Sequence, residues 1–341
     1  MLEQDQKAEF RAALLAWFDR QKRDLPWRRT RDPYAVWISE IMLQQTRVAA
    51  VIPYYERFLA AFPDLRRLAE ARESDLLAQW AGLGYYYRAR NLQKAARKMF
   101  ATGGFPSTYA EIRALPGVGE YTSAAVASIS FDLPHAAVDG NVLRVLSRVL
   151  TDGTEIGSGS GRKHFWEIAQ GLLAQDRPGA FNQAMMELGA TVCLPKTPQC
   201  LVCPVSHHCR ARQTGRQREF PVKLTRTKSA EEERRLFWIE RAGHLLLWQR
   251  PPDSRLMPGF WELPEPAQLP GVEPGKELGA FQHGITFHNY RFRVSQAEAP
   301  DEVGDCRWIA LASFATIPVS TVARKAERLI KRETRQVAAA R

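Results

Sequence analysis

Long apolar runs are missing from this chain of 341 residues. No stretch reaches the roughly 20 apolar residues that a membrane-spanning helix needs. The first residues, MLEQDQKAEFRAAL, carry acids in an amphipathic helical pattern, which differs from a secretory start. These absences predict a soluble, cytoplasmic protein in a reducing compartment, without a membrane partner.

Cysteine is also scarce, with five in the chain, which excludes a disulfide-rich scaffold. Cys193, Cys200, Cys203 and Cys209 share one window with the spacing C-x6-C-x2-C-x5-C, whereas Cys306 lies far away. Four thiolates gathered in this way can enclose one metal centre. The wide first gap does not fit the two C-x2-C-like pairs of most structural zinc sites. The spacing favours an iron–sulfur cluster, with zinc as the alternative.

Acidic residues are fewer than basic ones, with 37 Asp and Glu against 48 Lys and Arg, which gives a formal net charge of +11 and a pI near 9.6. The excess favours a polyanionic partner, because each neutralised phosphate releases counterions. Charge alone leaves open a basic protein that is merely soluble.

Alternating strand patterns are absent before the cysteines. Apolar residues recur there at helical spacing, in residues 9–21, 36–62, 74–84, 87–100 and 164–175. The Gly/Ser-rich residues 153–163 are expected to form a flexible loop. This half of the chain is therefore expected to be all-α.

After Cys209 the composition changes. Residues 236–250 have strand, glycine turn and strand character, residues 285–294 alternate with period two, and residues 321–336 form a basic amphipathic pattern. A charged stretch poor in large apolar residues precedes them, as in an interdomain linker. We expect a mostly α domain, a linker and a small α+β domain, over residues 1–212, 213–232 and 233–341.

A glycine-containing turn joins two expected helices in LPGVGEYTSAAVAS, residues 115–128. Gly117 and Gly119 permit positive φ and let backbone N–H groups approach a phosphate at the start of the following helix. Such a hairpin holds a DNA backbone without reading bases. A structural turn without a ligand is the alternative.

The hairpin, the segment VDGNV (138–142) and the four cysteines occur in an order that resembles the helix-hairpin-helix DNA glycosylases of the endonuclease III superfamily. Within that superfamily, WISEIMLQQT (37–46), GLGYYYRARNL (82–92) and the added C-terminal domain resemble the adenine DNA glycosylases of the MutY type. The resemblance covers nearly the whole chain. It implies a helix-hairpin-helix glycosylase fold with a 4Fe–4S loop at residues 193–209, followed by a Nudix-like lesion-recognition domain.

The resemblance also implies a pair of catalytic carboxylates, which can share the work of breaking a glycosidic bond. Asp139 would stay ionised against the sugar cation. Glu40, on an apolar helix face, would have a raised pKa and protonate adenine at N7. Asn141 would orient Asp139 or water, and Tyr121 would hydrogen-bond the acids. Without the resemblance, Glu40 could be a surface carboxylate and Asp139 an Asx turn.

A hairpin lysine is missing. Glycosylases of this superfamily that also cleave the strand carry a lysine that forms a Schiff base, and here Tyr121 matches its position. A phenol cannot form an imine. We therefore expect a monofunctional glycosylase that leaves the strand intact.

An enzyme that swings a base out of the duplex requires side chains that fill the gap left by the base and side chains that hold the base itself. The resemblance assigns Gln45 and Tyr85 to the gap, with Gln44 adjacent. Ordinary helix packing is the alternative for the residues that match the adenine pocket, namely Trp27, Arg28, Leu43, Val48 and Gln183.

The glutamate-rich box of a working Nudix enzyme is absent after residues 244–264, so magnesium-dependent hydrolysis is not expected. In the MutY type, a Phe-Ser-His-like loop of this domain reads 8-oxoguanine. Here Thr286 best matches the serine, Phe287 replaces the histidine and His288 is shifted by one position. The departure puts the lesion contacts in doubt.

The resulting hypothesis is a monomeric bacterial enzyme, acting at the nucleoid, that removes adenine paired with 8-oxoguanine or guanine in double-stranded DNA. A pyrimidine-specific glycosylase/lyase and a non-catalytic lesion-binding protein are the alternatives. Tyr121 and the C-terminal domain disfavour the first alternative, and the pairing of Glu40 with Asp139 disfavours the second.

Overall fold

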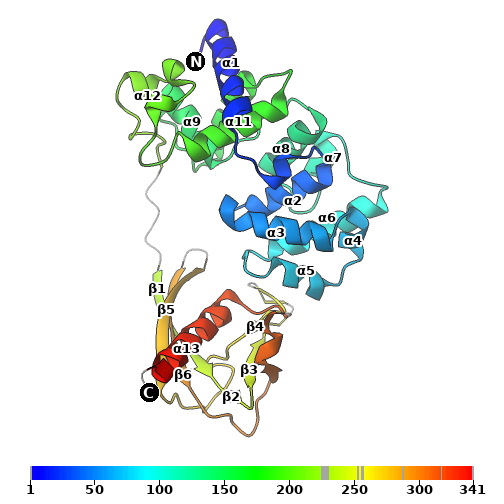
Figure 1. Cartoon of the computed structure of the whole chain (residues 1–341), viewed down its shortest axis with the longest axis vertical. Coiled ribbons are helices and arrows are strands. Elements are labelled where there is room, and N and C mark those ends of the chain that lie inside the picture. The colour runs from blue at the N-terminus through cyan, green and yellow to red at the C-terminus, as the bar shows by residue number, and fades with distance from the viewer. Residues whose placement is uncertain are drawn as a thin grey trace. The chain divides into compact units, whose positions relative to one another are not determined.

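The computed structural model describes residues 2–223, 230–251, 253–254, 257–285, 288–315 and 317–339. It divides into two compact units, and Figure 1 shows the whole chain. Unit 1 holds Met1–Glu70 and Asn91–Thr225, and unit 2 holds Ala71–Arg90 and Arg226–Arg341. No helix in these ranges is long and apolar enough to cross a membrane.

Unit 1 is built from helices, as the sequence predicts. Its α-helices are α1 (Gln4–Gln21), α2 (Pro33–Leu43), α3 (Val48–Ala61), α4 (Leu65–Glu70), most of α6 (Tyr87–Ala101), α7 (Tyr109–Arg113), α8 (Glu120–Phe131), α9 (Gly140–Leu150), α10 (Gly159–Leu172), α11 (Pro178–Thr191) and α12 (Arg210–Gln213). Its 3₁₀ turns are η1 (Pro26–Arg28), η2 (Cys200–Val202) and η3 (Ser206–His208).

Two boundaries in unit 1 differ from the sequence pattern. The helical pattern over residues 36–62 is broken by a turn at residues 44–47, where Gln45 has φ +58°. The expected Gly/Ser loop ends early, because the Ser158 hydroxyl accepts the Gly161 N–H at 3.0 Å and caps α10 from Gly159. A local hydrogen bond therefore extends the helix into a glycine-rich segment.

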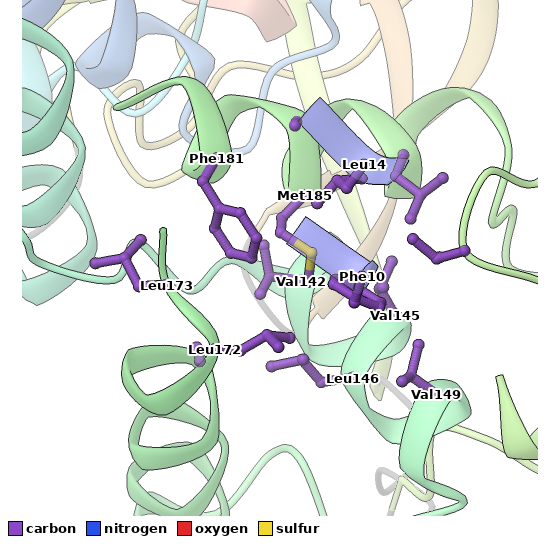
Figure 2. Close-up of a cluster of buried hydrophobic side chains, with 14 of the residues drawn as sticks. Phe10, Leu14, Val142, Val145, Leu146, Val149, Leu172, Leu173, Phe181 and Met185 are labelled. Carbon is purple, nitrogen blue, oxygen red and sulfur yellow. The ribbon is translucent and has the colours of Figure 1, made fainter. Parts of the chain in front are cut away.

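A buried apolar cluster fixes α9 between its neighbours. Figure 2 shows Val142, Val145 and Val149 of α9 facing Phe10 of α1 and Phe181 of α11. Burial of a side chain of this size stabilises by roughly 1.5–3 kcal/mol. The cluster thereby holds the N-terminus of α9, where Asp139 lies, in one place.

Unit 2 contains α5 (Glu73–Trp80) and the α+β part of the chain. One sheet has the order β1-β6-β5, with β1 (Ala230–Trp238) parallel to β6 (His288–Gln296) and β5 (Glu277–Ile285) antiparallel to β6. The second sheet has β2 (Glu240–Arg241), β3 (His244–Gln249) and β4 (Trp261–Glu262) in order, and β7 (Cys306–Ala310) also pairs with β3. The η4 turn (Leu311–Ala315) and α13 (Thr321–Ala339) follow.

Helix α13 has the predicted amphipathic character. Val322, Ala323 and Ala326 are buried in a core with Phe292 and Val294 of β6. Strand β1 begins at Ala230, inside the stretch expected to be linker. The mostly α and α+β arrangement is confirmed, and its α+β part is consistent with a Nudix-like domain.

Candidate functional site

Glu40 lies on a helix that is buried on nearly every side. Helix α2 begins with Pro33 at its first position, and the Asp32 carboxylate accepts the Tyr34 and Ala35 N–H groups at 3.3 and 3.1 Å. A proline start and an acidic cap are strong helix-start signals. Because α2 packs on α8, Glu40 is 5% exposed.

Asp139 is the N-cap of α9. Its Oδ1 accepts the backbone N–H groups of Asn141 and Val142 at 2.9 and 2.8 Å, and its Oδ2 accepts the Asn141 side-chain amide at 2.8 Å. A helix N-terminus favours an anion at this position. The same hydrogen bonds that make Asp139 the helix cap also fix its carboxylate, and the Asn141 amide supplies one of them, as the expected orienting role of Asn141 requires.

One cavity of about 610 Å³ in unit 1 is lined by Glu40, Asp139, Tyr121 and Asn141. This volume is in the range of small-molecule sites, which runs from roughly 300 to 1,000 Å³. The helices α2, α8 and α9 bring together residues that are far apart in the sequence. The site thus combines two carboxyl groups with space for a ligand.

Glu40 is held as a weak acid. Burial raises its pKa to about 7, and the nearby Asp139 charge also raises it. The Tyr121 hydroxyl donates a hydrogen bond of 2.7 Å to Glu40 Oε2 and opposes this rise, as does Arg28. A carboxyl group with a pKa near neutrality can donate a proton at physiological pH.

Burial also raises the pKa of Asp139 above its ordinary value, whereas the Val142 N–H, the Asn141 groups and Arg144 lower it. Three hydrogen bonds to the carboxylate favour its charged form. Asp139 is therefore the acid of the pair with the greater support for an anion.

The expected adenine pocket lies around the same cavity. Gln44 donates from Nε2 to the Thr122 hydroxyl at 3.1 Å, and Gln45 occupies the strained turn between α2 and α3. The Gln183 amide makes a long 3.3 Å bond to Gly179 O on its own helix. The cavity lining includes every residue expected for the pocket, together with Gln45 of the expected gap pair and its neighbour Gln44. The pocket residues are Trp27, Arg28, Leu43, Val48 and Gln183.

Glu187 is a lining residue that the sequence reasoning missed. Its carboxylate accepts Arg23 Nη2 at 2.7 Å and Arg28 Nη2 at 2.8 Å, and its side chain is 1% exposed. Burial raises the pKa of Glu187, but the two arginines outweigh it and hold the pKa at about 2. The ion pair between Glu187 and Arg28 fixes Arg28 at the cavity wall. The sequence does contain a signal for Glu187, namely an acidic residue within the apolar run AMMELGA.

The hairpin glycines have different conformations. Gly117 has φ +75°, and a Cβ there would lie 2.6 Å from Asn91 Cβ. Gly119 has φ −90° and caps α8, and no atom lies within 4 Å of a Cβ built on it. The positive φ that both glycines permit is adopted by Gly117 and not by Gly119. Neither glycine is among the residues that line the cavity.

The remaining expected contacts belong to unit 2. Tyr85 is 42% exposed and has φ +48°. His288 is exposed at the start of β6. Thr286 and Phe287, the other residues of the expected lesion-reading loop, lie outside the described residues.

The four cysteines of residues 193–209 interact electrostatically. Burial, together with the nearby Cys193, Cys209 and Cys200, raises the pKa of Cys203 to about 12, although a hydrogen bond from the Val205 backbone opposes the rise. Arg148, which is buried, donates to Cys193 Sγ at 3.3 Å. A metal centre would bind these four sulfurs as thiolates, and the Arg148 guanidinium would then lie beside the charge on Cys193.

Among the residues that the structure describes, no three His, Cys, Asp or Glu side chains form a group that could hold a single metal ion.

Comparison with known proteins gives matches over most of the chain. The family model described as "HhH-GPD superfamily base excision DNA repair protein" matches residues 38–170. Adenine DNA glycosylase of Mus musculus is 37% identical over 399 residues, which are 94% of this chain and 77% of that protein. The Homo sapiens protein of the same name is 37% identical over 94% of this chain and 73% of its own length.

Solved structures match the N-terminal part. A thermostable thymine-DNA glycosylase has a TM-score of 0.55 and 30% identity, covering 62% of this chain and 98% of that one. Endonuclease III in a non-covalent DNA complex has a TM-score of 0.54 over 63% of this chain and 99% of that one. Its identity of 24% supports a shared fold.

Proposed function

The chain belongs to the adenine DNA glycosylases of the HhH-GPD superfamily, and we propose that it removes adenine paired with 8-oxoguanine or guanine in duplex DNA. The observation that carries the proposal is the single cavity lined by Glu40 and Asp139, with the pKa of Glu40 raised to about 7. A protonated acid and an anion facing one space match the two needs of glycosidic bond cleavage.

The proposed reaction begins when adenine leaves the duplex and enters this cavity. Glu40 donates its proton to N7 of adenine, which makes the base a better leaving group. The Asp139 carboxylate stabilises the positive charge that develops on the sugar. Water then adds to the anomeric carbon and gives its proton to the Glu40 carboxylate, while Asn141 holds Asp139 in place.

The strand stays intact in this mechanism. A Schiff-base lyase needs an amine, and Tyr121 places a phenol beside Glu40. Tyr121 also donates a hydrogen bond from its hydroxyl to Glu40, so we assign it a supporting role beside the proton donor. This distinguishes the proposal from a glycosylase that also cuts DNA.

DNA binding is assigned to several parts of the chain. Gly117 and Gly119 would hold the backbone, Gln45 and Tyr85 would fill the gap left by the base, and the lesion would be read by residues 286–288.

The enzyme would have two domains, residues 1–212 and 233–341, joined by a linker. It would act as a monomer in the cytoplasm of a bacterium, at the nucleoid.

A 4Fe–4S cluster would be held by Cys193, Cys200, Cys203 and Cys209. The cluster would stabilise the loop of residues 193–209, which carries Lys196 and precedes Arg210 and Arg212, so that cations face the phosphates. Hydrolysis would need neither the cluster nor magnesium as a reactant.

The test uses duplexes with adenine opposite 8-oxoguanine, guanine and thymine. We expect free adenine from the first two duplexes and strand breaks only after alkali treatment. Breaks without alkali would indicate a lyase, and binding without base release would indicate a lesion-binding protein. Equal release from the duplex with thymine would contradict the mispair specificity.

A further inference from the structure

Tyr85 lies in a turn whose backbone is left-handed at several positions and is held by buried side chains. Gly82, Gly84 and Tyr85 all have positive φ, at +106°, +71° and +48°. The buried Arg88 donates to Gly84 O at 3.2 Å and lies over the rings of Trp80 and Tyr85. Trp80 Nε1 also donates to Gly84 O at 3.1 Å. A non-glycine residue in the left-handed region costs free energy and persists where its surroundings fix it.

The residue after Tyr85 is buried against a loop that is distant in the sequence. The ring centroids of Tyr86 and Phe260 are 4.0 Å apart with an angle of 45° between the planes. Tyr86 is 3% exposed and Phe260 is 0% exposed. Arg90 adds a second attachment, since its Nη2 donates to Pro258 O. All five residues belong to unit 2, so these contacts lie within one compact body.

The loop that receives Tyr86 is fixed to the C-terminal sheet. Gly259 N donates to Arg250 O and Arg250 N donates to Phe260 O, both at 2.9 Å. Gln249, the last residue of β3, donates from Nε2 to Gly259 O at 3.1 Å. Phe260 directly precedes β4. Gly259 and Phe260 are therefore hydrogen-bonded to Gln249 and Arg250 at the end of β3.

We propose that Phe260, in the C-terminal domain, is a positioning residue for Tyr85, acting through Tyr86. The inference rests on the proposed function, in which Tyr85 fills the gap left by the flipped adenine. Residues 257–260 hold the base of the Tyr85 turn, so the orientation of the Tyr85 ring depends on the domain assigned to lesion recognition. Base flipping is thereby coupled to the C-terminal domain by direct packing.

A double-mutant cycle tests this coupling. The single-turnover rate of adenine release is measured on the 8-oxoguanine duplex, together with the fluorescence of 2-aminopurine beside the target base, which reports unstacking. We expect Phe260→Ala to lower the rate roughly tenfold and to reduce the fluorescence rise. In a Tyr85→Ala background the same change should alter the rate by less than about twofold, because the residue through which it acts is gone.

Matched variants separate positioning from general destabilisation. Phe260→Leu keeps an apolar contact with Tyr86 and should restore most of the rate. Phe314→Ala, in the C-terminal core, should have the same effect with and without Tyr85. If Phe260→Ala fails to fold, Arg90→Ala takes its place, since it removes the second attachment at a partly exposed side chain.

Additive effects would overturn the inference. If Phe260→Ala or Arg90→Ala lowers the rate equally with Tyr85 and with alanine at position 85, the loop does not act through Tyr85. A wild-type protein that releases no adenine from any duplex would instead contradict the proposed function. The two failures are therefore distinguishable.

Discussion

Glu40 and Asp139 line one cavity with different hydrogen-bonding partners. Asp139 accepts two backbone N–H groups and a side-chain amide, whereas Glu40 accepts a tyrosine hydroxyl. Donors to a carboxylate stabilise its charge, whereas burial favours its protonated form. The charged form therefore has more hydrogen-bond support at Asp139 than at Glu40, which is the difference that the proposed roles of anion and proton donor need.

Glu40→Gln should abolish base release and preserve DNA binding. Glutamine is close in size to glutamate and cannot donate a proton to N7, so we expect the single-turnover rate to fall at least about a hundredfold. Binding to an uncleavable duplex, measured by gel shift, should change little. Excision near the wild-type rate would remove Glu40 from the mechanism.

The pH profile should follow Glu40. The donor must be protonated, so the single-turnover rate should be highest below pH 7 and should fall as pH rises through about 7. The Tyr121 hydroxyl lowers the pKa of Glu40, so Tyr121→Phe should raise that pKa and move the falling limb to higher pH.

Tyr34→Phe is the matched control for this profile. Its hydroxyl donates to Phe62 O at 2.7 Å, at the far end of α2 from Glu40. In the Tyr34→Phe variant, the pH at which the single-turnover rate falls should not change. If that pH also does not change in Tyr121→Phe, a group other than Glu40 sets the pH profile.

At the scale of elements, the hairpin between α7 and α8 depends on one left-handed residue. Gly117 combines φ +75° with a close approach to Asn91 on α6, so a side chain there meets both strain and a clash. Gly119 has an ordinary φ and open space. The two glycines of the same turn thus have different physical requirements.

Gly117→Ala should lower the free energy of unfolding by roughly 1–3 kcal/mol, as expected for a forced left-handed conformation. Gly119→Ala should leave it nearly unchanged. Thermal unfolding checks both values. If the hairpin N–H groups bind phosphate, Gly119→Ala should still weaken DNA binding, since it adds a methyl group beside those N–H groups. Equal loss of stability in both variants would contradict this difference.

At the scale of the whole molecule, the chain joins a helical body to an α+β body, each with its own apolar core. The cysteine loop lies at the end of the helical body, and Arg148 and Arg144 tie it to α9. Arg144 also donates to Asn141 Oδ1 at 2.9 Å. Loss of the loop should therefore disturb α9, whose first turn carries Asp139.

The purified protein should show a broad absorption band near ~400 nm from sulfide-bridged iron. Cys203→Ser should lose most of this band, whereas Cys306→Ser should keep it, because Cys306 lies in the C-terminal core. Absorption spectra with metal analysis check both variants. A colourless protein with one zinc per chain would contradict the cluster.

The fold class was largely predictable because helical and alternating periodicities are local properties. Residues 321–336 and the N-terminal helices follow their patterns closely. The break at residues 44–47 was not predicted, because no glycine or proline marks it and its one signal is the run of four polar residues, QQTR. Ala230 starts a strand because β6 supplies its partner, and no local preference of AEEERR indicates this.

The sequence by itself determined which chemical groups are available: two carboxyl groups in the right segments, a phenol in place of an amine, and four cysteines in one window. It could not decide their ionisation, because the pKa of Glu40 depends on burial by α8 and on the charge of Asp139. The pairing of Glu187 with Arg28 and the packing of Tyr86 on Phe260 likewise join residues far apart in the chain. Only tertiary structure excludes water from such places and brings distant groups within contact distance.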